Sequence, residues 1–328
     1  MQILNNIEDT NLVERLILQM KDEKNANRKG GIYYITQVEL AYNSNRIEGS
    51  RLSKEHTYNL FETSTILPNG NEVIDKNDII ETSNHFHAFN YILNTNKEPL
   101  TEKYIKYLHY MLKQWTDDAF KSWFNVGEYK KLENFIGEQT TSKPENVSKN
   151  IRELLTKYNK KNEKTIEDVI DFHVLFEKIH PFQDGNGRVG RLIMFKECLN
   201  NGIVPFIIDN EHKLFYYRGL REYDKEKGYL IDTCKSAQDK YRIYCDRLIS
   251  KEIDITLDKF IKICINKNYS NLKVLNECLK NNFIEFKDKT RIEKQKIVKD
   301  KIKNIQKKWK RFIEIIKIRD VFTSLILL

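Results

Sequence analysis

The chain has little glycine and proline, with only 12 and 5 of these residues among 328. Few residues are therefore available to break helices or to form the many tight turns of an all-β fold. Long stretches instead repeat Leu, Ile, Tyr and Lys at helical spacing. This composition predicts a mainly α protein in which β-structure is limited to short hairpins.

Cysteine pairs and long apolar runs are also lacking. The five cysteines are odd in number and form no Cys-x-x-Cys motif, which is typical of a protein kept in a reducing cytoplasm. The sequence shows no signal peptide and no apolar stretch long enough to span a membrane. We therefore expect a cytoplasmic protein, with a length that suits about two domains.

Apolar periodicity predicts a series of helices, and turn residues predict where they are interrupted. Short hairpins are expected around 67–71 and 132–141, where Asn, Gly and Thr gather. The expected helices lie near residues 31–48, 53–64, 77–95, 101–114, 146–160, 165–180, 187–201, 212–224 and 229–250.

The positive charge is confined to one end of the chain. Residues 251–328 contain 20 Lys+Arg and 10 Asp+Glu, whereas the rest of the chain contains 36 and 37. From Lys287 to Arg319, basic and apolar residues alternate at helical spacing, as in a basic amphipathic helix. Such a helix can bind nucleic acid, anionic lipid or an acidic partner, or pack its apolar face on its own protein. The sequence leaves these alternatives open.

The twelve residues from His180 to Arg191, HPFQDGNGRVGR, concentrate chemically active groups between two helical segments. His180 can act as a general base, because a histidine with a pKa of about 6.5 is largely unprotonated at neutral pH. Asp184 offers a hard oxygen ligand of the kind that binds Mg²⁺ beside substrate phosphates. The run predicts a site for a nucleoside triphosphate and its metal ion.

The second half of this run suits phosphate binding. Gly185 and Gly187 allow backbone angles closed to other residues, so their amides can converge on an anion. A helix that begins near Asn186 would add its free N–H groups and its dipole. Arg188 and Arg191 are three positions apart, share a helix face and suit paired contacts with phosphate oxygens. Each residue alone would fit an ordinary turn or a solvated face, but the combination favours a binding site.

A second motif, SNRIEG, ends the helix expected at 31–48. Ser44 and Glu48 are four positions apart and share one face of that helix. Gly49 fits a helix stop. The motif can therefore place one carboxylate near one of the two downstream arginines.

The run from His180 to Arg191 is similar, at every fixed position, to the Fic-domain signature His-x-Phe-x-Asp/Glu-Gly-Asn-Gly-Arg-x-x-Arg. Around it, residues 100–245 resemble the family domain, and residues 31–95 resemble the N-terminal helices of larger members. The resemblance implies a Fic-type helical bundle with a short β-hairpin flap. It also implies a nucleotidyltransferase that moves AMP from ATP to a Ser, Thr or Tyr hydroxyl of a target protein.

The resemblance assigns roles to individual residues. It implies that His180 deprotonates the target hydroxyl and that Asp184 holds Mg²⁺ between the α- and β-phosphates. Arg188 would stabilise the leaving pyrophosphate, and Arg191 would hold the γ-phosphate. The implied ATP-binding set is Gly185, Asn186, Gly187, Arg188, Arg191 and, as the adenine-facing aromatic, Tyr217.

The upstream motif resembles the Fic inhibitory motif, Ser/Thr-x-x-x-Glu-Gly/Asn. By this resemblance Ser44, Glu48 and Gly49 form an inhibitory element in which Glu48 pairs with Arg191. The pair would deny the γ-phosphate its anchor, so that the protein inhibits itself in cis. Whether Glu48 also helps to remove AMP stays open.

Two further features have a functional and a structural interpretation. Phe135, Ile136 and Gly137 lie where the family has its flap, a hairpin that holds the target backbone by strand addition. The alternative is an ordinary surface hairpin. The neighbouring Tyr216 and Tyr217 can face an adenine base or belong to the core.

The sequence thus predicts three parts: an N-terminal helical region at 1–95 with the inhibitory helix at about 31–49, a catalytic core at 96–250 and a basic helical region at 251–328. The expected partners are ATP and a target protein, while self-modification, a homodimer and nucleic acid bound by 251–328 stay open. Two other functions also stay open: a Fic-type transferase with another nucleotide donor, and a nucleic-acid-binding regulator.

Overall fold

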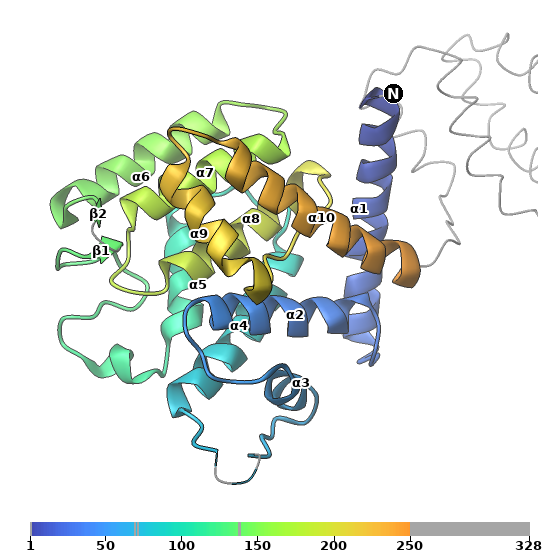
Figure 1. Ribbon diagram of the computed structural model, residues 1–328, viewed down its shortest axis with the longest axis horizontal. Coiled ribbons are helices and arrows are strands. Elements are labelled where there is room, and N and C mark those ends of the chain that lie inside the picture. The colour runs from blue at the N-terminus through green and yellow to red at the C-terminus, as the bar shows by residue number, and fades with distance from the viewer. Residues whose placement is uncertain (1, 69, 71, 137–138, 250–328) are drawn as a thin grey trace, which may run out of the picture. The chain divides into compact units, whose positions relative to one another are not determined.

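The computed structural model describes residues 2–68, 70, 72–136 and 139–249, which are mainly helical (Figure 1). The basic region expected at 251–328 lies outside these residues. The helices are α1 (Gln2–Asn25), α2 (Ile32–Ile47), α3 (Lys54–Thr63), α4 (Lys76–Asn94), α5 (Glu102–Lys113), η1 (Asp117–Phe120), α6 (Pro144–Asn159), α7 (Ile166–Ile179), α8 (Asn186–Asn201), η2 (Asn210–His212), α9 (Lys213–Glu222) and α10 (Gly228–Leu248). The strands β1 (Phe135–Ile136) and β2 (Gln139–Thr140) form one antiparallel hairpin.

Side-chain caps determine where several helices begin. Ser53, Thr101 and Thr165 each accept a hydrogen bond from the backbone N–H three residues later, at the starts of α3, α5 and α7. Asp75 caps α4, and Pro144 occupies the first position of α6, where a missing N–H costs little. All nine helices expected from the sequence are present, with each end within two residues of its prediction.

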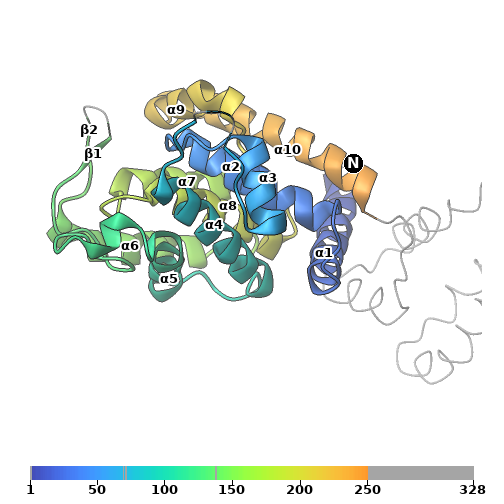
Figure 2. The ribbon, with the colours of Figure 1, turned by 90° about the horizontal axis from the view of Figure 1, so that it is seen from below.

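Helix α8 is the central element and is buried along most of its length. Helices α1, α2, α4, α5 and α7 contact it from several sides (Figures 1 and 2). Its side chains Val189, Leu192 and Phe195 join the main hydrophobic cluster. Each such burial stabilises the fold by about 1.5–3 kcal/mol. The packing therefore fixes the start of α8, where the signature run lies.

A second hydrophobic cluster brings the end of α2 to the same place. Ile47 of α2 packs in this cluster with Val174 of α7, Met194 of α8 and Tyr216 of α9. Helices α9 and α10 cross over α7 and α8 as a helical hairpin (Figure 1). The inhibitory motif expected from the sequence is thereby held beside α8.

Helix α1 was not among the predicted helices. Its buried residues Leu12, Val13, Leu16, Ile17 and Met20 nevertheless recur at helical spacing, so the signal is present in the sequence. Within the described ranges, α1 and the other helices are too short or too polar to cross a membrane.

The turn expected at 67–71 is present at Gly70, but the hairpin expected around it is not formed by the described residues, whereas the hairpin expected at 132–141 is confirmed. Among the described residues between α3 and α4 no strand is formed, and the apolar Leu67 and Val73 are exposed. A turn sequence makes a hairpin only when alternating apolar strands flank it, and here they are missing. In the second region Phe135 pairs with Thr140.

Candidate active site

The signature run forms the loop from α7 to α8 and the first turns of α8. His180 ends α7 with a left-handed backbone (φ 51°), and Gly185 (φ 83°) turns the chain into α8. Asn186 accepts a hydrogen bond from Phe182 N and donates one to Phe182 O, both at 2.8 Å. The side chain of Asn186, expected among the phosphate-contacting groups, is thus engaged inside the loop. The backbone N–H groups at the start of α8 remain suited to an anion.

His109 of α5 packs against this loop and supports it. Its ring stacks on buried Phe182, with centroids 3.9 Å apart and an interplanar angle of 3°. Gly127 N donates to Nδ1 of His109 at 2.9 Å, so the ring proton is on Nε2, which faces the carbonyl oxygen of Asp184 at 3.1 Å. Burial, and then the charge of Lys113, lower the pKa of His109 to about 3, which keeps the ring neutral.

His180 has the geometry of a general base. Its Nδ1 lies 3.3 Å from the carbonyl oxygen of Glu177, which can only accept, so Nδ1 carries the proton and Nε2 is the basic nitrogen. Burial, and then the nearby positive charge of Lys130, lower the pKa of His180 to about 4. The side chain is therefore neutral at physiological pH and able to accept a proton.

Arg191 is held by the end of α2. Its Nη2 lies 2.6 Å from Oε1 of Glu48 and 2.9 Å from the carbonyl oxygen of Ser44, and its Nε donates to Oγ of Ser44 at 3.1 Å. Burial would raise the pKa of Glu48, but Arg191 and then Arg188 outweigh it and hold the pKa below its usual range. Helix α2 ends here, and Gly49 follows with φ 105°. The two motifs expected to meet are in direct contact.

Two glycines of α8 lie against acidic or basic groups. A methyl group on Gly187 would overlap Oε1 of Glu48, so the carboxylate lies against the backbone expected to bind phosphate. A methyl group on Gly190 would be 2.6 Å from Nδ1 of His173 and 2.9 Å from Oε1 of Glu177. Larger residues at either position would displace these side chains.

Glu177 and His173 form a buried pair of titratable groups beside Arg191. Among the described residues, Oε1 of Glu177 and Nδ1 of His173 have no hydrogen-bond partner. Burial, and then the charge of Glu48, raise the pKa of Glu177 to about 8, while burial lowers that of His173 to about 3. Both groups are therefore neutral at physiological pH, and Nε2 of His173 contacts the hydroxyl of Tyr216 at 2.6 Å.

Asp184 and Arg188 belong to a second charge cluster. Oδ2 of Asp184 lies 2.7 Å from Nζ of Lys113 and 3.0 Å from Nη2 of Arg188. Both cations also contact Glu81 of α4. Burial would raise the pKa of Asp184, but Arg188 and Lys113 outweigh it and hold the pKa far below its usual range.

Asp184 fits a magnesium site that is shared with substrate. Its side chain is about half exposed, and both cations contact the same oxygen, Oδ2. Among the described residues no group of three His, Cys, Asp or Glu side chains could hold a metal by itself. Mg²⁺ commonly binds through one or two carboxylates together with phosphates and water. The donor set therefore fits Mg²⁺ only when a nucleotide supplies the remaining ligands.

The two tyrosines expected near the base differ in position. Tyr216 is buried, and its hydroxyl contacts His173 as described above. Tyr217 is partly exposed, and its hydroxyl donates to the carbonyl oxygen of Ile47 at the end of α2, 3.2 Å away. Tyr217 thus has an accessible ring, as an adenine-facing residue requires, whereas Tyr216 is a core residue.

The hairpin expected to be the flap is tied to the loop that follows His180. Phe135 of β1 is exposed, while Gly137 lies outside the described residues. Buried Lys130 donates to the side chains of Asn134 and Thr141, each at 2.6 Å, and its backbone N–H donates to the carbonyl oxygen of Pro181. Lys130 therefore links both sides of the hairpin to the residue after His180.

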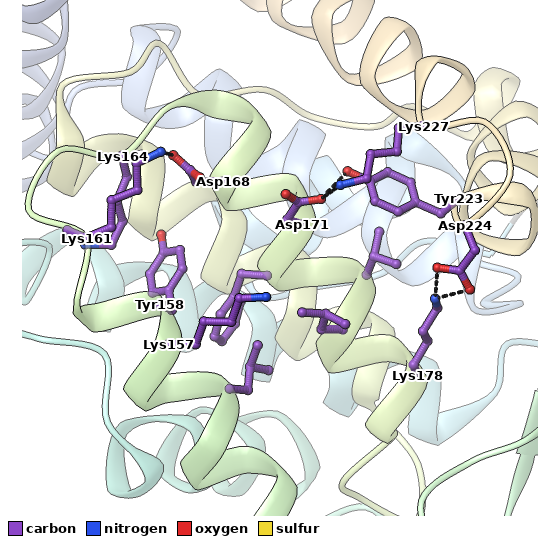
Figure 3. A pocket seen from close by; sticks show the side chains of 14 residues that line it. Lys157, Tyr158, Lys161, Lys164, Asp168, Asp171, Lys178, Tyr223, Asp224 and Lys227 are labelled. Atoms are coloured by element: carbon purple, nitrogen blue, oxygen red, sulfur yellow. Dashed lines mark hydrogen bonds and ion pairs between the residues drawn. The ribbon is translucent and has the colours of Figure 1, made fainter.

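A hollow also lies away from this site. A groove of about 320 Å³ runs along α6, α7 and the connection from α9 to α10, and its lining includes none of the residues of the signature run (Figure 3). Its aspartates are paired with lysines, as in Lys178–Asp224 at 2.6 Å and Lys227–Asp171 at 2.8 Å. These pairs leave no cluster of reactive groups, so we assign no chemistry to this groove.

Sequence reasoning missed several residues that contact the signature run, among them Glu81, Lys113, Lys130 and Glu177. Glu177 lies three positions before His180, so helical spacing could have indicated it. The other three come from separate segments, and no local pattern marks them.

Comparison with known proteins agrees with this geometry. Residues 99–198, from the start of α5 to near the end of α8, match the model of the Fic/DOC family. The chain is 32% identical over 165 residues to a probable protein adenylyltransferase of Aquifex aeolicus, which covers 49% of this chain and 50% of that protein. It is 25% identical over 185 residues to the protein adenylyltransferase Fic of Nematostella vectensis, covering 55% of this chain and 42% of the relative. The chain thus spans half or less of the length of these relatives.

Solved structures show the same fold. A Fic domain-containing signalling protein of Bacteroides thetaiotaomicron superposes with a TM-score of 0.56 at 22% identity, covering 71% of this chain and 95% of that one. Fic-1 of Caenorhabditis elegans superposes with a TM-score of 0.55 at 19% identity, covering 74% and 73%. The protein therefore has the helical fold of these Fic proteins, and its residues 99–198 match the Fic/DOC family model.

Proposed function

We propose that this protein is a protein adenylyltransferase that transfers AMP from ATP to a Ser, Thr or Tyr hydroxyl of a target protein. The observation that carries the proposal is the neutral His180, whose Nε2 is basic, at the start of the loop that leads into α8. The backbone of Gly187 and the guanidinium of Arg191 lie at the first turns of that helix. The names of the curated relatives support the same reaction class.

In the proposed reaction the target hydroxyl oxygen attacks the α-phosphorus of ATP. A new O–P bond forms, the bond from the α-phosphorus to the bridging oxygen breaks, and pyrophosphate leaves. Nε2 of His180 takes the hydroxyl proton. Charge on the phosphates is stabilised by Arg188, Arg191 and the N–H groups of Gly185 and Gly187, because phosphoryl transfer depends mainly on positioning and charge stabilisation.

Asp184 is the residue that would hold Mg²⁺, and the ion, when bound, neutralises phosphate charge and orients the triphosphate. Tyr217 offers its accessible ring to the adenine base. Phe135 and Ile136 would register the target backbone by strand addition, which fixes the position of its hydroxyl without reading much of its sequence.

The same proposal includes autoinhibition by α2. The carboxylate of Glu48 contacts both Arg191 and the backbone of Gly187, two groups that a bound triphosphate needs. A nucleotide must therefore displace Glu48. The free-energy cost of this displacement lowers the affinity of the protein for the nucleotide. Each ~1.4 kcal/mol of displacement cost lowers the affinity tenfold.

The experiment that tests the proposal compares wild type, Glu48→Gly and His180→Ala. ATP labelled at its α-phosphate is mixed with each protein, Mg²⁺ and cell lysate, and labelled protein is detected on a gel. We expect strong labelling with Glu48→Gly, weak labelling with wild type and none with His180→Ala. Glu39→Ala is a matched control, because Glu39 lies on the same helix and pairs with Lys54, away from the site.

Equal labelling by wild type and Glu48→Gly would retain the transferase and reject the autoinhibition. Absence of labelling from ATP in every variant would reject AMP transfer. ATP would then be replaced in turn by other labelled nucleotides. Labelling from one of those nucleotides alone would identify a different donor for the same site.

A further inference from the structure

Four charged side chains of the site form a closed ring in which the signs alternate. Lys113 Nζ lies 2.6 Å from Oε1 of Glu81 and 2.7 Å from Oδ2 of Asp184. Arg188 contacts the same two carboxylates, through Nη1 at Oε2 of Glu81 and through Nη2 at Oδ2 of Asp184, the latter at 3.0 Å. Each cation thus bridges both anions. A closed network holds its members more firmly than isolated pairs do.

The ring is buried where it meets the core. The side chains of Lys113 and Arg188 are 2% and 4% exposed, whereas that of Asp184 is 48% exposed. Asp118 adds a further carboxylate at 2.9 Å from Nζ of Lys113. Buried ion pairs are screened little by solvent, so the two cations fix the orientation of Asp184 while its outer side stays accessible.

The carboxylate partners of the two signature arginines differ in kind. Glu48, the partner of Arg191, lies at the end of α2 next to a glycine. Glu81, the partner of Arg188, lies within α4 and also binds Lys113. The first contact can open when one helix end moves, whereas the second is part of the framework.

Resting on the proposed function, we propose that Glu81 and Lys113 are positioning residues of the nucleotide site, which orient Asp184 and Arg188 and set how strongly nucleotide binding depends on a divalent cation. Lys113 places a positive charge on the carboxylate that would bind the metal, and it therefore opposes a second cation there. Glu81 neutralises part of the charge of Lys113 and Arg188 and limits their pull on Asp184.

The two residues therefore have opposite electrostatic effects. Loss of the charge of Lys113 leaves Asp184 more negative, which strengthens its attraction for Mg²⁺. Loss of the charge of Glu81 leaves Asp184 as a main partner of both Lys113 and Arg188. Their positive charges then act more strongly on Asp184, which weakens its attraction for Mg²⁺. A role limited to stability would not produce effects of opposite sign.

The test measures ATP binding by calorimetry, with saturating Mg²⁺ and with EDTA, in full-length protein that carries Glu48→Gly. The ratio of the two dissociation constants reports the coupling between metal and nucleotide and needs no AMP transfer. We expect Lys113→Met to raise this coupling by about fivefold or more and Glu81→Gln to lower it by about the same factor. Lys113→Arg keeps the charge and is expected to leave the coupling within about twofold of the parent.

Lys121→Met is the matched control, because Lys121 also contacts Asp118, at 2.6 Å, but lies outside the ring. It should change the coupling by less than about twofold. Thermal unfolding of each variant without ligand shows that the protein is folded. Shifts of the same sign in Lys113→Met and Glu81→Gln, or no shift in either, would overturn the proposal.

The two proposals fail in different ways. If the coupling shifts as expected but no variant labels a protein, the ring assignment stands and AMP transfer does not. If labelling is strong but the coupling is unchanged, the transferase stands and the role of Glu81 and Lys113 is rejected.

Discussion

Oε1 of Glu48 lies so close to the backbone of Gly187 that there is no room for a methyl group between them. A carboxylate therefore occupies the start of α8, where free N–H groups and the helix dipole favour an anion. The contact that we propose to be inhibitory is thus more than an ion pair with Arg191. It also fills the surface on which a phosphate oxygen would lie.

Ser44→Ala should activate the protein less than Glu48→Gly. Ser44 contributes one side-chain hydrogen bond to Arg191, of the kind that is worth about 0.5–1.5 kcal/mol. We expect the variant to bind ATP roughly three- to tenfold more tightly than wild type does. Glu48→Gly removes the charged partner and should increase the affinity on the order of a hundredfold. Calorimetry with ATP and Mg²⁺ measures both, and the reverse ranking would contradict this account of the contact.

The proposed AMP transfer should continue in mildly acidic solution. The pKa of His180 is lowered to about 4, so its basic form persists far below the usual histidine range. Transfer by Glu48→Gly, measured as initial rate against pH, should lose half of its rate well below about pH 6. A midpoint near the ordinary histidine pKa would show that the burial of His180 does not control its titration.

Glu177→Gln should stabilise the protein in alkaline solution. The native state keeps the Glu177 proton up to a pKa of about 8, whereas the unfolded state releases it near the ordinary value of 4.5. Since the native state binds more protons across this window, wild-type stability falls as the pH rises through it. The variant lacks this loss and should be more stable at about pH 8 by on the order of 2 kcal/mol, with a smaller difference at about pH 5. Thermal unfolding at both pH values tests this, and an equal difference at both would refute it.

Lys130→Met should impair the use of the target protein while leaving ATP binding intact. The lysine connects Asn134 and Thr141 of the hairpin with the loop beside His180. Its removal should lower kcat/KM for the target by about tenfold, because a loosened hairpin registers the target chain poorly. It should also raise the pKa of His180, since Lys130 is one cause of the lowered value.

A neighbouring variant controls for general effects of the Lys130 substitution. Lys131→Met makes the same chemical change at an exposed position and should behave like the parent. If calorimetry shows that Lys130→Met binds ATP more weakly, the loss of activity would come from the nucleotide site and not from the hairpin.

Local signals made much of the fold predictable. Helix starts coincide with capping residues such as Ser53, Thr101 and Thr165, and the apolar spacing between them is regular. The loop from His180 to Gly185 was likewise predictable, because its glycine and helix start are contiguous in the sequence. The hairpin wrongly expected at 67–71 shows the limit: its turn residues were recognised, but a turn does not supply the strands on either side.

The long-range parts of the site could not be read from the sequence alone. Lys113 and Asp184 are 71 positions apart, and Glu81 comes from yet another helix, so no periodicity relates them. The pairing of Glu48 with Arg191 was expected only through the resemblance to a known family. The side chain of Asn186 was predicted to contact phosphate, but it bonds to the backbone of Phe182 and holds the loop together.

Because His109 supports the loop, the signature residues alone are not sufficient to rebuild the site in another protein. The loop rests on the flat face of this imidazole, and its two nitrogens bond to the backbone on either side, at Gly127 and Asp184. A graft of residues 180–191 onto another pair of helices would carry the reactive groups but leave this support behind. Any transplant of the site would therefore have to include α5, which supplies both this ring and Lys113.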